Sequence, residues 1–81
     1  MRIQVKLFAV ARQLAECDTI SVELADQATV ADLRVAIPQQ HPTLAGIVGQ
    51  LKFAVDADYA IDSHVLNESQ EVACIPPVSG G

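Results

Sequence analysis

The sequence is poor in aromatic residues, cysteines and cations, and each shortage excludes a class of protein. There is no tryptophan, and only 4% of the residues are aromatic, so we expect a core of valine, isoleucine, leucine and alanine. Two cysteines, Cys17 and Cys74, are too few and too far apart for a disulfide framework, and we expect reduced thiols. Five Lys and Arg against ten Asp and Glu give a net charge of −5, the wrong sign for a nucleic-acid backbone or an anionic membrane.

Long hydrophobic runs are also missing. No apolar stretch approaches the ~20 residues that cross a bilayer. At the N-terminus, Arg2, Gln4 and Lys6 alternate with apolar residues, which is unlike a signal peptide. We therefore expect a cytoplasmic protein that binds neither nucleic acid nor membrane. The 81 residues are 51% hydrophobic, which is enough for one folded domain with a small core.

The apolar pattern predicts several short strands around one main helix. Good helix formers also predict a short helix over residues 9–16. Thr29 followed by Asp32 is typical of a capped helix start, and Val30, Leu33 and Ile37 would form its buried face. We expect regular helix to falter at Pro38, because an interior proline removes a hydrogen bond. Alternation predicts strands over 3–7, 20–24, 53–55, 59–61 and 72–75, with turns over 56–58 and 67–70.

The most informative segment is the last, Pro76-Pro77-Val78-Ser79-Gly80-Gly81. Glycine has the most backbone freedom to lose on ordering, so a final glycine pair suggests that a bare chain matters there. The prolines lack an N–H group and would end the preceding strand. We interpret residues 1–76 as the folded domain and residues 77–81 as a flexible tail whose terminal carboxylate does the chemistry.

These features together resemble a known family. Two stretches are similar to the small, sulfur-carrier subunit of molybdopterin synthase. The first is Leu7-Phe8-Ala9 with Arg12, and the second is Glu71-Val72-Ala73 leading into the proline and glycine tail. The resemblance covers the whole length. The sequence departs from the family pattern at Gln13, Asp56, Ser69-Gln70, Cys74 and Ile75, and these differences concern turns and packing rather than the tail. The implied fold is α+β: a ubiquitin-like β-grasp with a mixed sheet packed on one main helix.

The resemblance also implies a function. An E1-like activating enzyme would consume ATP to adenylate Gly81, with Gly80 as its unhindered neighbour, and a sulfur donor protein would convert the adenylate into a thiocarboxylate. The chain would then enter a large catalytic subunit, as part of a heterotetramer, and give its sulfur to cyclic pyranopterin monophosphate in molybdenum cofactor biosynthesis. It would not be an enzyme by itself and would hold no stable cofactor, only a transient AMP adduct. Alternatives with the same fold are a sulfur carrier for thiamine, a protein modifier, or an interaction module with an inert tail.

Strand alternation adds a prediction about the partner surface. If Ile3, Val5 and Leu7 face the core, Phe8 points to the opposite side, and Ile75 does the same on the last strand. We expect Phe8 and Ile75 to form one exposed apolar patch that binds partners. The tail residues that we expect to bind partners with it are Pro76, Pro77, Val78 and Ser79.

No other cluster predicts catalysis or metal binding. His41 and His64 are interpreted as surface imidazoles, and Asp56, Asp58 and Asp62 as a solvated turn, since the glycine and bidentate glutamate of a calcium loop are absent. No glycine-rich phosphate loop follows a strand, so we expect ATP to be bound by the activating enzyme.

Overall fold

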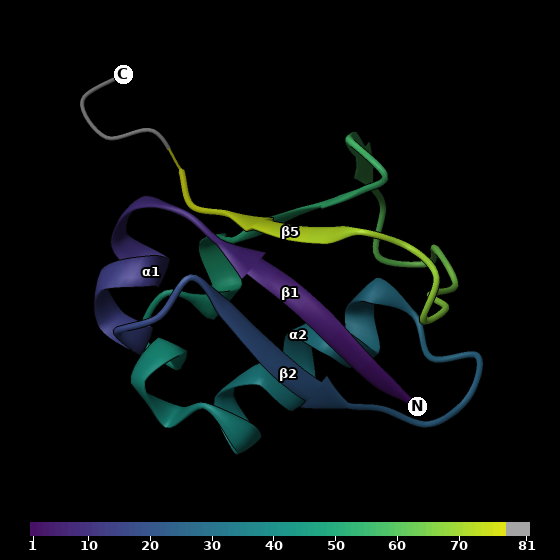
Figure 1. Cartoon of the computed structure of the whole chain (residues 1–81), viewed down its shortest axis with the longest axis horizontal. Coiled ribbons are helices and arrows are strands. Elements are labelled where there is room, and N and C mark those ends of the chain that lie inside the picture. The colour runs from purple at the N-terminus through teal and green to yellow at the C-terminus, as the bar shows by residue number, and fades with distance from the viewer. Residues whose placement is uncertain (78–81) are drawn as a thin grey trace.

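The computed structural model describes residues 1–77 and contains one mixed sheet and two α-helices (Figure 1). The strand order is β2-β1-β5-β3-β4. The last strand lies at the centre of the sheet, parallel to β1 and antiparallel to β3, so the predicted β-grasp architecture is confirmed. The elements are β1 (Arg2–Leu7), α1 (Ala9–Ala15), β2 (Thr19–Glu23), α2 (Val30–Gln40), β3 (Lys52–Val55), β4 (Asp58–Ala60) and β5 (Val72–Ile75).

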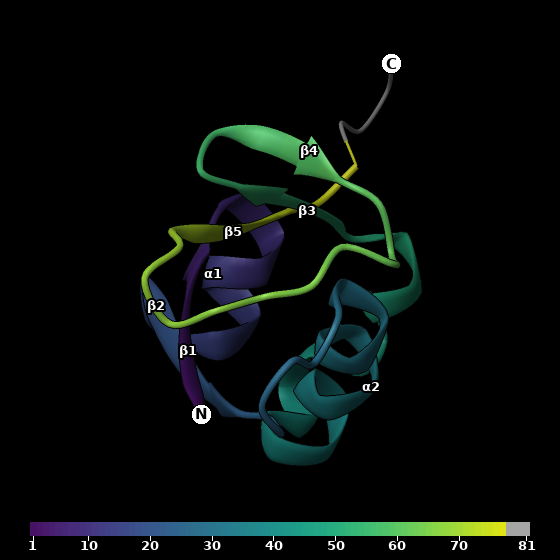
Figure 2. The same cartoon turned by 90° about the vertical axis from the view of Figure 1, so that its right-hand side faces the viewer.

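The core lies between the sheet and its two helices, which cover the same face (Figure 2). On β1 the inward residues Ile3, Val5 and Leu7 are at most 3% exposed, while the residues between them are exposed. On α2 the predicted face of Val30, Leu33 and Ile37 is fully buried. The opposite face of the sheet carries no helix in residues 1–77 and remains open to solvent.

The core contains one aromatic side chain that the composition did not lead us to expect. Phe53 on β3 is 1% exposed. The Arg34 guanidinium lies 5.0 Å from the centre of its ring and donates hydrogen bonds to the carbonyls of Val48 and Leu51 at 3.0 and 2.7 Å. Arg34 therefore fastens α2 to the segment that leads into β3.

Helix α2 begins as predicted and ends later than predicted. The capping box is present: the Asp32 amide donates to Thr29 Oγ1 at 3.3 Å, and the Thr29 amide donates to Asp32 Oδ2 at 2.8 Å. The expected break at Pro38 is wrong, because the helix continues to Gln40. Tertiary contacts hold this last turn: the Gln40 side-chain amide accepts from the Glu23 N–H at 2.8 Å and donates to the Glu23 carbonyl at 2.9 Å. These bonds to edge strand β2 offset the one that proline cannot make.

The connections after α2 are short and tight. Two 3₁₀ turns, Pro42–Leu44 and Val48–Gln50, connect α2 to β3. The predicted turn between β3 and β4 is confirmed, and both of its central residues have positive φ, 51° at Asp56 and 73° at Ala57. This is the backbone of a two-residue type I′ hairpin, which usually selects Asn-Gly.

Candidate functional site

Strand β5 carries the chain to the root of the predicted tail. It pairs with β1 on one side and with β3 on the other. Its last residue, Ile75, lies opposite Lys52 of β3, one residue beyond the last β1 pair, Leu7 with Cys74. The strand ends before the two prolines, as expected from their missing N–H groups. Pro76 is buried and Pro77 is exposed. The site residues Val78, Ser79, Gly80 and Gly81 lie outside the described residues, so their predicted roles and the tail boundary remain predictions.

Phe8 projects from the open face of the sheet, as the alternation predicted. It follows β1 in extended conformation, with φ −133° and ψ 155°, so the in-and-out pattern of the strand continues through it. Its side chain is 48% exposed. The chain turns into α1 directly afterwards through Ala9, whose φ is 51°. The Phe8 carbonyl accepts from the Ala11 amide at 3.1 Å, which fixes the start of the helix.

Phe8 and Ile75 line one hollow beside the root of the tail, as their predicted common face requires, but Ile75 is half-buried and not exposed as expected. The parallel register aligns Lys6 with Ala73 and Leu7 with Cys74, which places Phe8 next to Ile75. Between them lies a hollow of about 450 Å³, which we call the tail-root hollow. An apolar hollow at this point suits a partner that also receives the tail. Its lining residues are Phe8, Ala9, Val10, Gln13, Ile75, Pro76 and Pro77.

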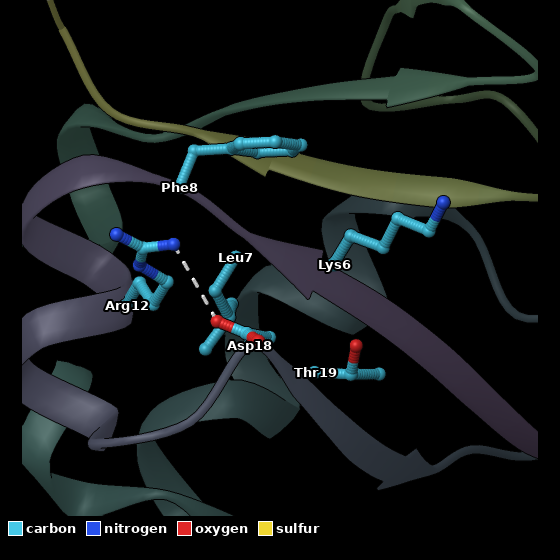
Figure 3. Close-up of a pocket in the computed structure, with 6 residues that line it drawn as sticks. All are labelled: Lys6, Leu7, Phe8, Arg12, Asp18 and Thr19. Atoms are coloured by element: carbon cyan, nitrogen blue, oxygen red, sulfur yellow. Dashed lines mark ion pairs between the residues drawn. The ribbon is translucent and has the colours of Figure 1, made fainter.

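A second, smaller hollow also includes Phe8 in its lining (Figure 3). It measures about 200 Å³ and is lined by Lys6, Leu7, Phe8, Arg12, Asp18 and Thr19. Arg12 Nη1 lies 3.6 Å from Asp18 Oδ1, a long ion pair between two exposed side chains. Phe8 thus lines both hollows.

The open face continues beyond the predicted patch. Tyr59 on β4 and Ile61 just after it are 70% and 73% exposed. Ala54 pairs with Ala73 on one side and with Tyr59 on the other, so the surface runs without a break from β5 to β4. Sequence reasoning recognised a strand here but did not predict that its side chains extend the open face. Period-two alternation of Tyr59 and Ile61 was the available signal.

The cysteines are free thiols, as predicted, in very different surroundings. Cys17 is exposed, whereas Cys74 is 0% exposed in the core. Burial raises the pKa of the Cys74 thiol from 9.0 to about 11, partly opposed by the positive charge of Arg34. A buried thiol that stays protonated is a poor nucleophile, so Cys74 is a packing residue here.

The histidines and aspartates form no metal site within residues 1–77, where no group of three or more candidate ligands gathers. His41 and His64 are partly exposed, which agrees with their interpretation as surface imidazoles. His41 Nε2 donates to the Ser21 carbonyl at 2.8 Å and thereby packs on β2. Asp56, Asp58 and Asp62 are exposed, as predicted.

Comparison with known proteins assigns the family. The ThiS family model matches residues 5–81. The chain belongs to the ThiS family. It is 37% identical over 83 residues to the molybdopterin synthase sulfur carrier subunit of Chlamydomonas reinhardtii, with 100% of both chains covered.

Solved structures agree on the fold of this ThiS-family chain. Small archaeal modifier protein 1 of Haloferax volcanii superposes with a TM-score of 0.84 at 26% identity, covering 95% of this chain and 98% of that one. A chain from the complex of subunits 1 and 2 of molybdopterin-converting factor from Helicobacter pylori superposes with a TM-score of 0.68 at 20% identity, and the match covers 100% of both chains. No helix in residues 1–77 is long and apolar enough to cross a membrane.

Proposed function

We propose that this chain is the sulfur carrier subunit of a molybdopterin synthase and that Gly81 carries the sulfur. A relative of that name shares 37% identity across its full length, and the family match continues to Gly81. The observation that carries the proposal is the tail-root hollow. Its apolar residues include Phe8, which directly follows β1, and Ile75, which ends β5 and directly precedes the proline pair. The body of the molecule thus offers a docking surface where the tail departs.

The proposed chemistry uses only the terminal carboxylate. An E1-like enzyme joins the Gly81 carboxylate to AMP from ATP and releases pyrophosphate. A sulfur donor then displaces AMP, leaving a thiocarboxylate. In a large catalytic subunit the thiocarboxylate sulfur forms a bond to cyclic pyranopterin monophosphate. Water then cleaves the bond between this sulfur and the Gly81 carbonyl carbon, which restores the carboxylate. Glycine suits the position because it leaves the carbonyl carbon open to attack.

The buried thiol of the domain supports a mechanism in which only the tail carries sulfur. Cys74 stays protonated, so the carrier body offers no competing thiolate beside the tail. The solved Helicobacter pylori complex pairs subunit 1 of molybdopterin-converting factor with subunit 2, and its superposed chain has this fold. We propose a corresponding large subunit as the main partner here.

Substitutions in the tail-root hollow test the docking surface. Ile75→Asp and Phe8→Asp each place a carboxylate in an apolar contact, and we expect binding of the large subunit to weaken by about tenfold or more. Val35→Asp is the matched control, because Val35 is 62% exposed on α2, away from the open face. Calorimetric titration with folded variants measures the effect. Equal affinities for Ile75→Asp, Phe8→Asp and wild type would contradict docking at this surface.

Deletion of Gly81 tests the carrier role separately from docking. We expect the shortened chain to bind the large subunit and to support no sulfur transfer. A docking module with an inert tail would keep full activity in the same assay.

A second function is favoured by the likeness to small archaeal modifier protein 1. A modifier would transfer activated Gly81 to a lysine amine instead of receiving sulfur. Incubation with the activating enzyme, ATP and cellular protein distinguishes the two. We expect thiocarboxylate without covalent conjugates, and conjugates ending at Gly81 would favour the modifier.

A further inference from the structure

Lys52 differs from every other cationic side chain of the protein. All five Lys and Arg residues lie within the described residues 1–77. Four of them form ion pairs with carboxylates: Arg2 with Glu23 at 2.7 Å, Lys6 with Glu71 at 3.0 Å, Arg12 with Asp18 at 3.6 Å and Arg34 with Asp62 at 3.1 Å. Within that part of the chain, Lys52 has no carboxylate partner, although acidic residues outnumber basic ones by two to one.

The position of Lys52 places it on the surface that the proposed partner covers. It is the first residue of β3 and lies opposite Ile75, the residue that precedes the tail prolines. Its ammonium group lies 5.7 Å from the centre of the Tyr59 ring. The ring belongs to an exposed side chain of the same open face. An attraction between cation and ring is weak at a solvated site, so Tyr59 orients the lysine without replacing a carboxylate.

Docking changes the energetics of this lysine. A partner that covers Ile75 and the exposed ring of Tyr59 removes water from the ammonium between them. Burying a charge is costly unless an opposite charge and hydrogen bonds replace the lost water. This chain offers no carboxylate for that purpose within its described residues, so the complementary group has to come from the partner.

We propose that Lys52 is a specificity-determining contact of this carrier, and that it pairs with a carboxylate on the large catalytic subunit. The inference rests on the proposed function, because it concerns the complex in which the tail is received. The pair would select a large subunit with an acidic side chain opposite β3 and reject one with a cation there. Charged contacts of this kind contribute more to partner choice than to raw affinity.

Three substitutions at Lys52 test the pair against the purified large subunit. We expect Lys52→Met to weaken binding by about tenfold or more, because it leaves the partner carboxylate unpaired, and Lys52→Glu to weaken it further. Lys52→Arg keeps the charge and should bind within about threefold of wild type. Arg2→Met is the matched control, since Arg2 already has Glu23 and lies at the opposite end of β1. Raising the salt concentration should weaken binding of the large subunit more for wild type than for Lys52→Met.

A charge swap then identifies the partner group. Replacing the acidic residue of the large subunit that faces Lys52 by lysine should restore binding of Lys52→Glu and weaken wild type. The proposal is overturned if Lys52→Met binds as tightly as wild type, which would mean that the ammonium escapes to water at the rim. It is also overturned if only binding to the activating enzyme changes. In both cases wild type still binds and transfers sulfur, so the proposed function stands.

Discussion

The thiol of Cys74 makes the protein sensitive to alkaline pH. Burial raises its pKa to about 11 in the folded state, against 9.0 for the ordinary thiol. Well below pH 9 the thiol is protonated in both states, so it does not lower the free energy of unfolding there. Between pH 9 and pH 11 the unfolded chain loses this proton and the folded chain retains it, so the free energy of unfolding falls as pH rises. At pH 11 the loss attributable to this thiol amounts to about 2 kcal/mol.

Urea denaturation at several pH values, for wild type and for Cys74→Ala, measures this effect. The difference in unfolding free energy between the two proteins should shrink by about 2 kcal/mol from pH 8 to pH 11. Cys17→Ala, a change at the exposed thiol, should leave the wild-type slope unaltered. Identical slopes for wild type and Cys74→Ala would refute the reasoning.

Alkylation gives an independent measure of the same thiol. At pH 8 a pKa of about 11 leaves roughly a hundredfold less thiolate than a pKa of 9.0, before burial further restricts access. Iodoacetamide should therefore modify Cys17 first, and Cys74 only in urea. Because Cys74 is a buried packing residue, a folded Cys74→Ala variant should still acquire sulfur at Gly81. Loss of that modification would give Cys74 a role in the chemistry.

Three further predictions concern the fold. Ala57→Gly should raise the free energy of unfolding by about 0.5–1 kcal/mol, because Ala57 has a φ of 73°; no gain in urea denaturation would contradict a strained hairpin. Arg34→Met should lower the free energy of unfolding by about 2–3 kcal/mol, because the charged hydrogen bonds to two carbonyls are lost. Asp62→Asn removes only the exposed ion pair of Arg34 and should lower it by less than about 1 kcal/mol. Equal losses would show that the ion pair dominates. Gln40→Ala should cost about 1 kcal/mol and speed amide exchange at Glu23, its backbone partner; unchanged exchange would show that Gln40 does not protect the edge of β2.

The sequence predicted the elements whose signals are local. Alternation located β1 and β5 and placed Phe8 and Ile75 on the same open face, because side-chain direction in a strand follows from period two. The capping box at Thr29 was readable for the same reason: both of its hydrogen bonds join residues three apart.

What the sequence missed depends on contacts between distant residues. The last turn of α2 survives Pro38 because Gln40 bonds to Glu23, seventeen residues earlier. His41 is half-buried because it meets β2, which no local pattern indicates. Lys52 has no signature in the sequence, because its lack of a carboxylate partner within residues 1–77 becomes visible only when the partners of the other cations are known.

The most direct test of the central claim is the intact mass of the chain through one reaction cycle. After incubation with the activating enzyme, ATP and a sulfur source, the mass should rise by the difference between one sulfur and one oxygen atom, with fragmentation placing the change at Gly81. Addition of the large subunit and cyclic pyranopterin monophosphate should return the mass to its starting value. Sulfur located on Cys17 or Cys74, or equal sulfur transfer by a chain whose Gly81 is amidated, would contradict the account.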